Sequence, residues 1–461
     1  MVANRSIPAW AAGLAVMSAY TSSISYIATP GKAFDENWHP LIFALMLIPV
    51  CWAVSRYVVP WYHKTKTISV YAFLEERLGY WARFYAAFSF VLYMIGRMAV
   101  ILYLASLLLD NFLPWQLNQI IFVVGIITIL YTLLGGMEAV IWTDVIQSII
   151  MIGGLMYCGI YLSLEVLSVD ASMFNSAYEA GKFSLGGLNL SLNERTIWVM
   201  IIYGLTENLR NLIADQNYVQ KYVSVSSLKD ARRSIWMATW IYLFMTLVFL
   251  YIGTALWMYY VPGQAELPAS IGKGDEVFPY FIASELPPGL KGLILAAIVA
   301  AAMSTMDSAL NCSATVINLD FYRRSWSKGS SDRKELTVLR WSTVVWGILG
   351  TLFALWMISA KSALDVWWQI SGIFGGGILG LFLLALMKIK ISTKQGVAAV
   401  GVSIIIITWG TFARNLSPNL EWMECHIDPI IIGALGTGGL ILVAYLMSSM
   451  NQIQSGRYKS N

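Results

Sequence analysis

The chain has 461 residues, of which 58% are hydrophobic and 12% charged, and its mean hydropathy is +0.65. Soluble domains carry about 25% charged residues, so this composition excludes a water-soluble globular protein. The formal net charge of +4 is spread between apolar blocks and not gathered in one basic stripe, which argues against nucleic acid as a partner.

Apolar blocks long enough to cross a hydrocarbon core of about 30 Å recur along the whole chain. They are continuous, so they predict spanning helices and not barrel strands, because backbone polar groups in lipid must be satisfied within the segment. The sequence predicts an all-α membrane protein, a single transporter domain over 1–461 with about twelve transmembrane helices. The expected spans are 8–29, 38–60, 81–112, 117–136, 138–168, 196–216, 229–261, 288–322, 336–359, 365–387, 394–413 and 428–449.

Basic residues gather in alternate loops. If the N-terminus is cytoplasmic, the inside loops hold most of the lysines and arginines, including Lys221 and those within 64–66, 229–233, 323–334 and 388–394. The outside loops hold few basic residues and more acidic ones. This asymmetry predicts a multi-pass protein of the inner (plasma) membrane with both termini cytoplasmic.

Cysteine and histidine usage argues against a disulfide framework, a zinc site and a metalloenzyme. Three of the four cysteines lie within apolar blocks, none in a CxxC spacing, and the histidines lie near block ends without a metal-binding pattern. The first ten residues lack the features of a cleaved signal peptide. The residues concerned are Cys51, Cys158, Cys312, Cys425, His39, His63 and His426.

The first block contains the polar run SAYTSSIS at 18–25, followed by Pro30 and Gly31. Hydroxyl side chains at this density compete for backbone hydrogen bonds, so the helix is expected to unwind here and to expose carbonyl groups. The alternative is a Ser/Thr face packed against a neighbouring helix.

The third and fifth blocks each carry a charge. Arg97 lies near the middle of its block and must face the bundle interior and meet an anion. That anion is either a protein carboxylate such as Glu207 or a carboxylate on the solute. Asp144 lies at the start of the fifth block, where it is either functional or interfacial.

The sixth block contains the polar run GLTENLRN at 204–211, which predicts a second broken helix. Blocks one and six would begin two five-helix sets, 8–168 and 196–387, followed by two accessory helices at 394–449. Interrupted helices at matching positions indicate an inverted-repeat transporter with a site at the midplane.

The eighth block places Ser304, Asp307 and Ser308 on one helix face. A carboxylate in this setting needs a cation, and hydroxyl, carbonyl and carboxylate oxygens are the ligands of hard cations. The alternatives are an aspartate bonded to its own serines or a protonated one.

Taken together, several motifs resemble the sodium:solute symporter family, which includes sodium/glucose cotransporters and bacterial sodium/sialic acid symporters. The resemblance runs from about residue 5 to about residue 387. It is carried by SSIS at 22–25, PGKAF at 30–34, IGR at 95–97, GGMEAVIWTDVIQ at 135–147, DQNYVQK at 215–221 and AAAMST at 300–305.

The resemblance implies a leucine-transporter-type 5+5 inverted repeat that works by alternating access with sodium as coupling ion. Two sodium sites follow from matching motif positions, the second being present in some members only; at that second site Asp307 stands where the sialic acid branch has serine. The first would use Ser18, Thr21, Ala301, Ser304 and Thr305, and the second Asp144, Ser304, Asp307 and Ser308.

The resemblance also implies a solute site beside the two helix breaks. Arg97 stands where sialic acid transporters keep an arginine for the substrate carboxylate, whereas Ala44 and Gly204 depart from the sialic acid pattern. Most members begin with an additional helix before the first block, so either the true start lies upstream or this member lacks that helix. The matching solute positions are Ser22, Ser25, Arg97, Gly204 and Asn208, and Glu207 adds an acid nearby.

We therefore expect a non-enzymatic, monomeric symporter that imports a sugar, sialic acid or sugar acid with sodium across the lipid bilayer. A proton-coupled transporter of the same fold is the first alternative, because Asp307 could carry a proton. A transporter-like sensor is the second alternative, although no signalling module follows residue 450.

Overall fold

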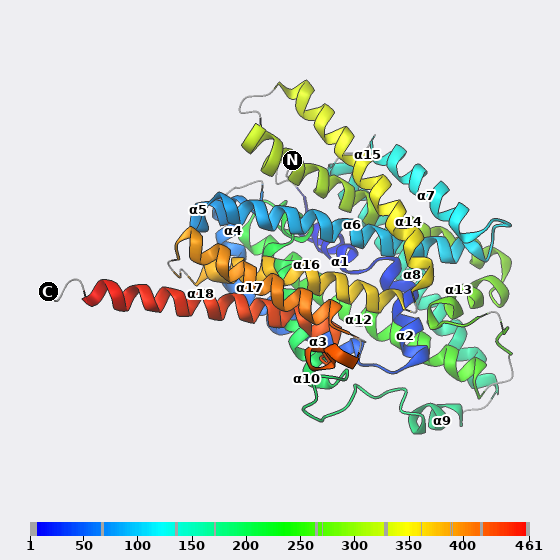
Figure 1. The fold of residues 1–461 in the computed structure, drawn as a ribbon. Coiled ribbons are helices and arrows are strands. Elements are labelled where there is room, and N and C mark those ends of the chain that lie inside the picture. Colours follow the sequence, from blue (N-terminus) through cyan, green and yellow to red (C-terminus); the bar gives the residue numbers. More distant parts are fainter. Residues whose placement is uncertain are drawn as a thin grey trace.

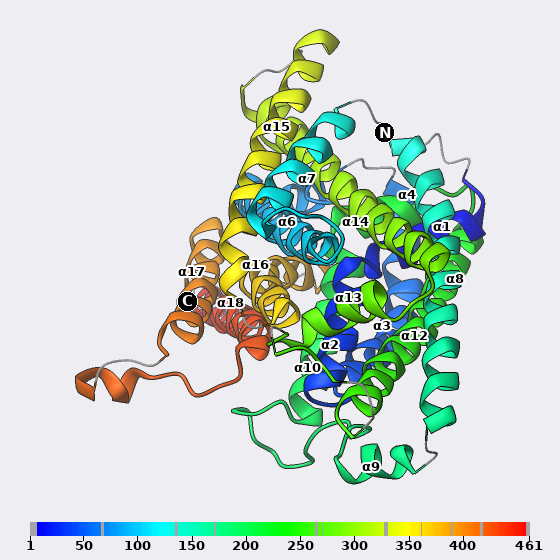
Figure 2. The same cartoon turned by 90° about the vertical axis from the view of Figure 1, so that its right-hand side faces the viewer.

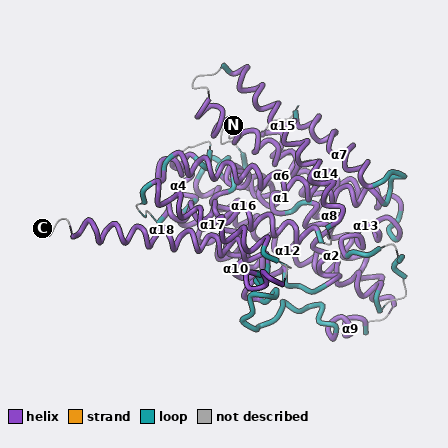
Figure 3. Tube along the Cα trace, viewed as in Figure 1, coloured by secondary structure: helices purple, strands orange, loops and turns teal. Residues whose placement is uncertain are grey.

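A computed structural model describes residues 7–65, 69–133, 137–169, 172–262, 266–269, 271–326, 331–360, 362–387, 389, 391–414 and 418–457. These residues form a bundle of helices joined by loops, without strands in the described ranges (Figure 3). Most of the helices run roughly parallel or antiparallel to one direction (Figure 1). The helices α4 and α5 and the C-terminus lie at one end, and α9 and α13 lie at the other.

The first half of the chain is built of long helices with short ones at the bundle ends. Its elements are α1 (Ala9–Tyr20), the π-helical turn η2 (Ile24–Ala28), α2 (Thr29–Asp35), α3 (Pro40–Tyr57), α4 (Val59–Thr65), α5 (Ala72–Leu78), α6 (Tyr80–Asp110), α7 (Leu117–Thr132), α8 (Met137–Val169) and α9 (Met173–Glu179).

The second half continues in the same way, with a second interrupted helix at its start. Its elements are α10 (Ile197–Ala214), α11 (Gln216–Tyr222), α12 (Leu228–Tyr260), α13 (Gly274–Ser284), α14 (Pro288–Val316), η3 (Ile317–Trp326), α15 (Asp332–Trp356), η4 (Met357–Ser359), α16 (Ala363–Leu386), α17 (Thr393–Phe412), η5 (Pro418–Met423), η6 (Pro429–Ile431) and α18 (Ile432–Arg457).

The expected spans correspond to helices throughout. Within the described ranges, nine helices are long and apolar enough to cross a membrane, and the apolar helices α1 and α7 are shorter. The remaining expected span is α10, which has the required 18 residues but a polar second half. The prediction of an all-α membrane protein is confirmed.

The α6 helix lies at the centre of the bundle, where it is buried over most of its length and packs against α14, α15 and α16. The view down the bundle from the α13 end shows α13 lying across the helices that enclose α2 (Figure 2). At Gly253 of α12 an added Cβ would clash with the carbonyl of Pro30, so α2 and α12 are in backbone contact there. Large apolar side chains on α7, α8, α15 and α17 face outward, as a surrounding bilayer requires.

Candidate solute and sodium sites

The first helix is interrupted within the polar run expected to unwind. The α1 helix ends at Tyr20, and Thr21 has the extended angles φ −106° and ψ 107°. The Ser25 hydroxyl donates to the Tyr20 carbonyl at 3.1 Å, and the Ser22 hydroxyl accepts from the Ile24 amide at 3.2 Å. Hydroxyl groups thus replace part of the backbone pairing that the break removes, as predicted from the density of serines.

The second interruption lies later than the sequence predicted. The α10 helix continues through 204–211 and ends at Ala214, and the chain turns at Asp215 with φ −95° and ψ 116°. The Asp215 carboxylate caps α11 by accepting from the Asn217 amide at 2.9 Å. The run at 204–211 stays helical because its charged side chains bind one another, so the helix need not unwind to satisfy them.

A cavity lies between the two interruptions, at the junction of α1, α10, α11 and α16. Its volume is about 60 Å³. Four predicted solute residues line it, namely Ser22, Ser25, Arg97 and Glu207. The sequence reasoning missed the aromatic walls, whose only signal was the abundance of Tyr and Trp near the breaks. These walls are Tyr20, Phe43, Tyr218, Tyr242, Trp367 and Trp368.

The other two predicted solute residues, Gly204 and Asn208, lie on α10 against α3. Asn208 donates to the Phe43 carbonyl at 2.9 Å and to the Gly204 carbonyl at 2.8 Å. A Cβ at Gly204 would stand 2.9 Å from the Met46 Cβ, so this glycine allows the two helices to pack closely. In this conformation both residues contribute to the packing of α10 against α3 and do not line the cavity.

Arg97 is a buried cation without an ion pair among the described residues. One Nη donates to the Ala19 carbonyl at the end of α1, while Nε and the other Nη have no hydrogen-bond partner in the described part of the chain. The guanidinium lies 5.8 Å from the ring centre of Tyr218 and 5.7 Å from that of Trp367. Because unpaired buried donors are costly, two N–H groups are available to an anionic ligand.

Glu207 was one of the two candidate partners for Arg97, but it pairs with another arginine. Arg210 donates to both Glu207 oxygens, at 2.6 and 3.0 Å, and also lies 3.3 Å from Asp215. The Ser371 hydroxyl of α16 donates to Glu207 as well. The carboxylate is therefore held by α10 and α16 and does not pair with Arg97.

The predicted first sodium site lies where the end of α1 packs against α14. The carbonyls of Met17, Ala19 and Tyr20 accept hydrogen bonds, whereas that of Ser18 receives none from the described residues. The Thr21 hydroxyl is also buried without a described partner.

On the α14 side of the first site, the Thr305 hydroxyl donates to the Ala301 carbonyl at 2.9 Å. The Ser304 side chain lies outside the described residues. On the α1 side, the Ser18 carbonyl and the Thr21 hydroxyl are buried oxygens of the kind that a sodium ion takes, so this half of the site fits the ion.

The predicted second sodium site contains a protein cation. Asp144 is fully buried, and its Oδ2 lies 3.0 Å from the Nζ of Lys221, which is buried as well. Asp307 accepts from the Asn311 amide at 2.9 Å, and the Ser308 hydroxyl has no described partner. Lys221, which the sequence placed among the loop charges, is instead the counter-ion of the acid at this site.

Comparisons with known proteins agree with this architecture. The family model described as the sodium:solute symporter family matches residues 1–403. The sodium/sialic acid symporter of Proteus mirabilis is 32% identical over 414 residues, which is 89% of this chain and 83% of that protein. The sodium/sialic acid symporter of Aliivibrio fischeri is 30% identical over 447 residues, 96% of this chain and 86% of that protein.

A solved structure of a Na⁺-coupled sialic acid symporter, described as a substrate-bound outward-open state, superimposes with a TM-score of 0.86 at 30% identity. The match covers 97% of this chain and 91% of that one. The fold is thus the leucine-transporter-type 5+5 inverted repeat. The chain belongs to the sodium:solute symporter family, the sodium-coupled secondary transporters of the membrane.

Proposed function

We propose that this protein imports an anionic, sugar-like solute, such as a sialic acid or another sugar acid, together with sodium. The observation that carries the proposal is Arg97, a buried guanidinium with two unpaired N–H donors on the wall of the cavity. A carboxylate on the solute would accept charge-assisted hydrogen bonds from these donors. The aromatic rings beside it offer flat apolar faces to a sugar ring.

Sodium acts in this proposal by holding the end of α1 against α14. Ser18 and Thr21 on one side and Ala301, Ser304 and Thr305 on the other would hold the ion. Because binding is reciprocal, sodium raises the affinity for the solute and the solute raises the affinity for sodium by the same factor. A membrane potential of 100 mV adds about 2.3 kcal/mol for each charge that moves inward.

We infer one sodium ion per cycle from the first site alone. At the second site the ammonium of Lys221 already balances Asp144 at 3.0 Å. A second cation among Asp144, Ser304, Asp307 and Ser308 would have to share that carboxylate with a lysine. Proton coupling through Asp307 is the alternative that the experiment below separates.

The chain functions in the plasma membrane as a monomer, with both termini in the cytoplasm. The excess of lysine and arginine in alternate loops of the sequence supports this orientation. The two repeats comprise 8–168 and 196–387, with accessory helices over 394–449. No catalytic step and no nucleic acid enter this function.

Uptake into proteoliposomes tests sodium coupling. We expect accumulation of a labelled sialic acid with an inward sodium gradient, and none with a potassium gradient or a pH gradient alone. Replacing Ser304 and Thr305 together by alanine should abolish the sodium dependence. Sodium-independent uptake, or unchanged uptake by the double variant, would overturn the coupling mechanism.

Solute binding to the purified protein tests the role of Arg97. Each charge-assisted hydrogen bond contributes about 1.5–3 kcal/mol, so Arg97→Ala should weaken binding of a sugar acid at least tenfold. Arg97→Lys keeps the charge but loses the planar guanidinium and its additional donors, and should recover only part of the affinity. Binding of neutral hexoses alone, with sugar acids excluded, would show that Arg97 is structural.

A further inference from the structure

Two buried arginines lie near the solute cavity, and they share the nearby acids unequally. Arg210 lies 2.6 Å from Glu207 and 3.3 Å from Asp215, and all three side chains are buried. Arg97 pairs with neither acid, and two of its N–H groups have no partner among the described residues. One of the two cations therefore holds both acids.

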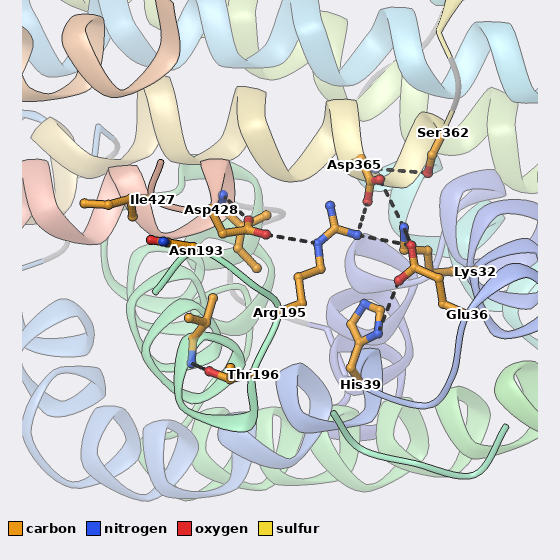
Figure 4. Close-up of polar contacts among 12 residues, drawn as sticks. Lys32, Glu36, His39, Asn193, Arg195, Thr196, Ser362, Asp365, Ile427 and Asp428 are labelled. Carbon is orange, nitrogen blue, oxygen red and sulfur yellow. Dashed lines mark hydrogen bonds and ion pairs between the residues drawn. The ribbon is translucent and has the colours of Figure 1, made fainter. Parts of the chain in front are cut away.

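The charged side chains at the α13 end of the bundle do not change this division (Figure 4). There Arg195 lies 2.9 Å from Asp365 and 3.5 Å from Asp428. None of these three side chains lines the cavity. Within the described part of the chain, the cavity wall thus contains one acid, Glu207, and one cation, Arg97.

The geometry of α10 holds Arg210 on Glu207. The two residues are three positions apart on one helix face. Arg210 donates from Nη2 to Oε1 at 2.6 Å and from Nε to Oε2 at 3.0 Å. Such a two-bond pair fixes the direction of the carboxylate as well as its position. Because both partners belong to α10, the pair does not depend on how closely the other walls of the cavity approach.

Two neighbouring helices make room for this pair. On α6 the ring centre of Tyr93 lies 4.1 Å from the Arg210 guanidinium carbon, within the range of a cation–π contact. On α16 an added Cβ at Gly375 would clash with the Arg210 Cδ, so the glycine provides space for the arginine. Ser371 of α16 donates to Glu207. Packing from three helices therefore favours the pairing of Arg210 with Glu207.

Glu207 keeps some capacity to accept hydrogen bonds. A carboxylate paired with a guanidinium is an acceptor only, with about four lone-pair sites. Arg210 fills two of them and Ser371 fills one. About one site is left on a carboxylate that lines the cavity. A hydroxyl group of the solute can donate to it, whereas a second carboxylate on the solute would meet a like charge.

Removing Arg210 would change the state of both cavity charges. Glu207 and Arg97 line the same cavity of about 60 Å³. A buried carboxylate that loses its cation is costly, and so are the unpaired donors of Arg97. Without Arg210 the two groups are free to pair with each other across the cavity. Arg97 would then be occupied before the solute arrives.

We propose that Arg210 is a positioning residue for solute recognition, because it binds Glu207 and so reserves Arg97 for an acid group on the solute. The fixed Glu207 carboxylate then determines specificity: it accepts from a hydroxyl group and disfavours a second acid group. The solute class narrows to hydroxylated monocarboxylates. The assignment to sugar acids rests on the proposed function, whereas the selection by Glu207 between a hydroxyl and a carboxylate does not.

Equilibrium binding of a sialic acid to the purified protein in sodium chloride tests the positioning role. Arg210→Gln should weaken binding by about tenfold or more, because the released Glu207 occupies Arg97. Arg210→Gln combined with Glu207→Gln should bind within about threefold of Glu207→Gln alone, since nothing then competes for Arg97. A general loss of structure caused by removing Arg210 would not be repaired by the second substitution.

Two solutes that differ in one group test the Glu207 carboxylate itself. Periodate shortens the glycerol side chain of sialic acid to an aldehyde, which reduction converts to a hydroxymethyl group and oxidation to a second carboxylate. The wild type should bind the hydroxymethyl form about tenfold or more tightly than the dicarboxylate. Glu207→Gln should narrow this ratio by about fivefold or more, because the amide is uncharged and can donate to the second acid group.

Asp215→Asn is the matched control. It removes the same charge from the surroundings of Arg210, but Asp215 does not line the cavity. The asparagine keeps an oxygen for the Asn217 amide that Asp215 caps. We expect the ratio of the two affinities to stay within about twofold of the wild type, because the removed charge faces Arg210 and not the solute. An equal change in Asp215→Asn and Glu207→Gln would show an effect of net charge and overturn the specificity role.

The remaining outcomes are distinct. An unchanged ratio in Glu207→Gln, which keeps Arg210 paired with Asp215, would overturn the role of the carboxylate even if the Arg210 variants do not fold. An unrecovered affinity in a folded double variant would overturn the role of Arg210. If the wild type binds neutral hexoses and no sugar acid, the proposed function fails. Glucose and glucuronate, which differ by the same exchange of groups, then decide the inference: Glu207→Gln should admit glucuronate, and its continued exclusion would refute the selection by Glu207.

Discussion

The buried pair of Asp144 and Lys221 permits a quantitative test. The Oδ2 to Nζ distance is 3.0 Å, and the side chains are 1% and 2% exposed. At an effective dielectric constant of about 20 their attraction is about 5 kcal/mol. Removing one partner of a buried pair costs about 3–5 kcal/mol, because the remaining charge is left uncompensated.

We therefore expect Lys221→Met to lower the free energy of unfolding by about 3–5 kcal/mol. Asp144→Asn combined with Lys221→Met should recover most of this loss, since neither charge of the pair then remains. Chemical unfolding in mixed micelles at fixed pH measures all four proteins of the double-mutant cycle.

Comparing a sodium salt with a salt that lacks sodium provides a further test with the same double-mutant cycle. Lys221→Met removes the ammonium from the Asp144 carboxylate, an oxygen ligand that a sodium ion can take. The variant should lose less stability in sodium chloride than in choline chloride, while the wild type shows a smaller difference. A loss below about 1 kcal/mol in both salts, the range of a solvent-exposed pair, would refute the reasoning.

Three further predictions concern the α13 end. Gly253→Ala places a methyl group against the Pro30 carbonyl, so it should lower the melting temperature and the uptake rate. Lys182→Met removes the ammonium 2.5 Å from the Phe34 carbonyl at the end of α2, and hydrogen exchange of residues 29–36 should accelerate. Burial lowers the pKa of His39 to about 3, so the unfolded chain binds a proton below about 6.5 that the folded chain does not. The free energy of unfolding should fall as the pH drops from 7 to 5, by about 2 kcal/mol more than in His39→Gln. An equal fall in both proteins would contradict a buried, neutral imidazole at this position.

Sequence alone predicted the spanning helices closely, because the bilayer sets their length and forces their backbone pairing to be local. The expected spans 81–112, 229–261 and 394–413 became Tyr80–Asp110, Leu228–Tyr260 and Thr393–Phe412. The break after Tyr20 could also be predicted from the sequence, because it is caused by the local density of hydroxyl groups. Features that depend on neighbouring residues, such as the helix spans and this break, can therefore be predicted from the sequence.

The second break was placed too early for an identifiable reason. A polar run inside an apolar block indicates either an unwound segment or a set of mutually satisfied side chains. Glu207 and Arg210 are three residues apart on one helix face and pair directly, so the backbone stays helical. The chain turns instead at Asp215, whose carboxylate caps the next helix.

Length, hydropathy and the spacing of polar residues thus determined the helices, their number and the presence of Arg97 in the bundle interior. The tertiary structure decided which charges meet, because partner choice depends on packing between remote segments. Asp144 and Lys221 are 77 positions apart, and Lys32 and Asp365 are 333 positions apart. Only the packed bundle shows that Arg97 is left without an ion pair among the described residues and that Lys32 and Arg195 meet Asp365 at the α13 end.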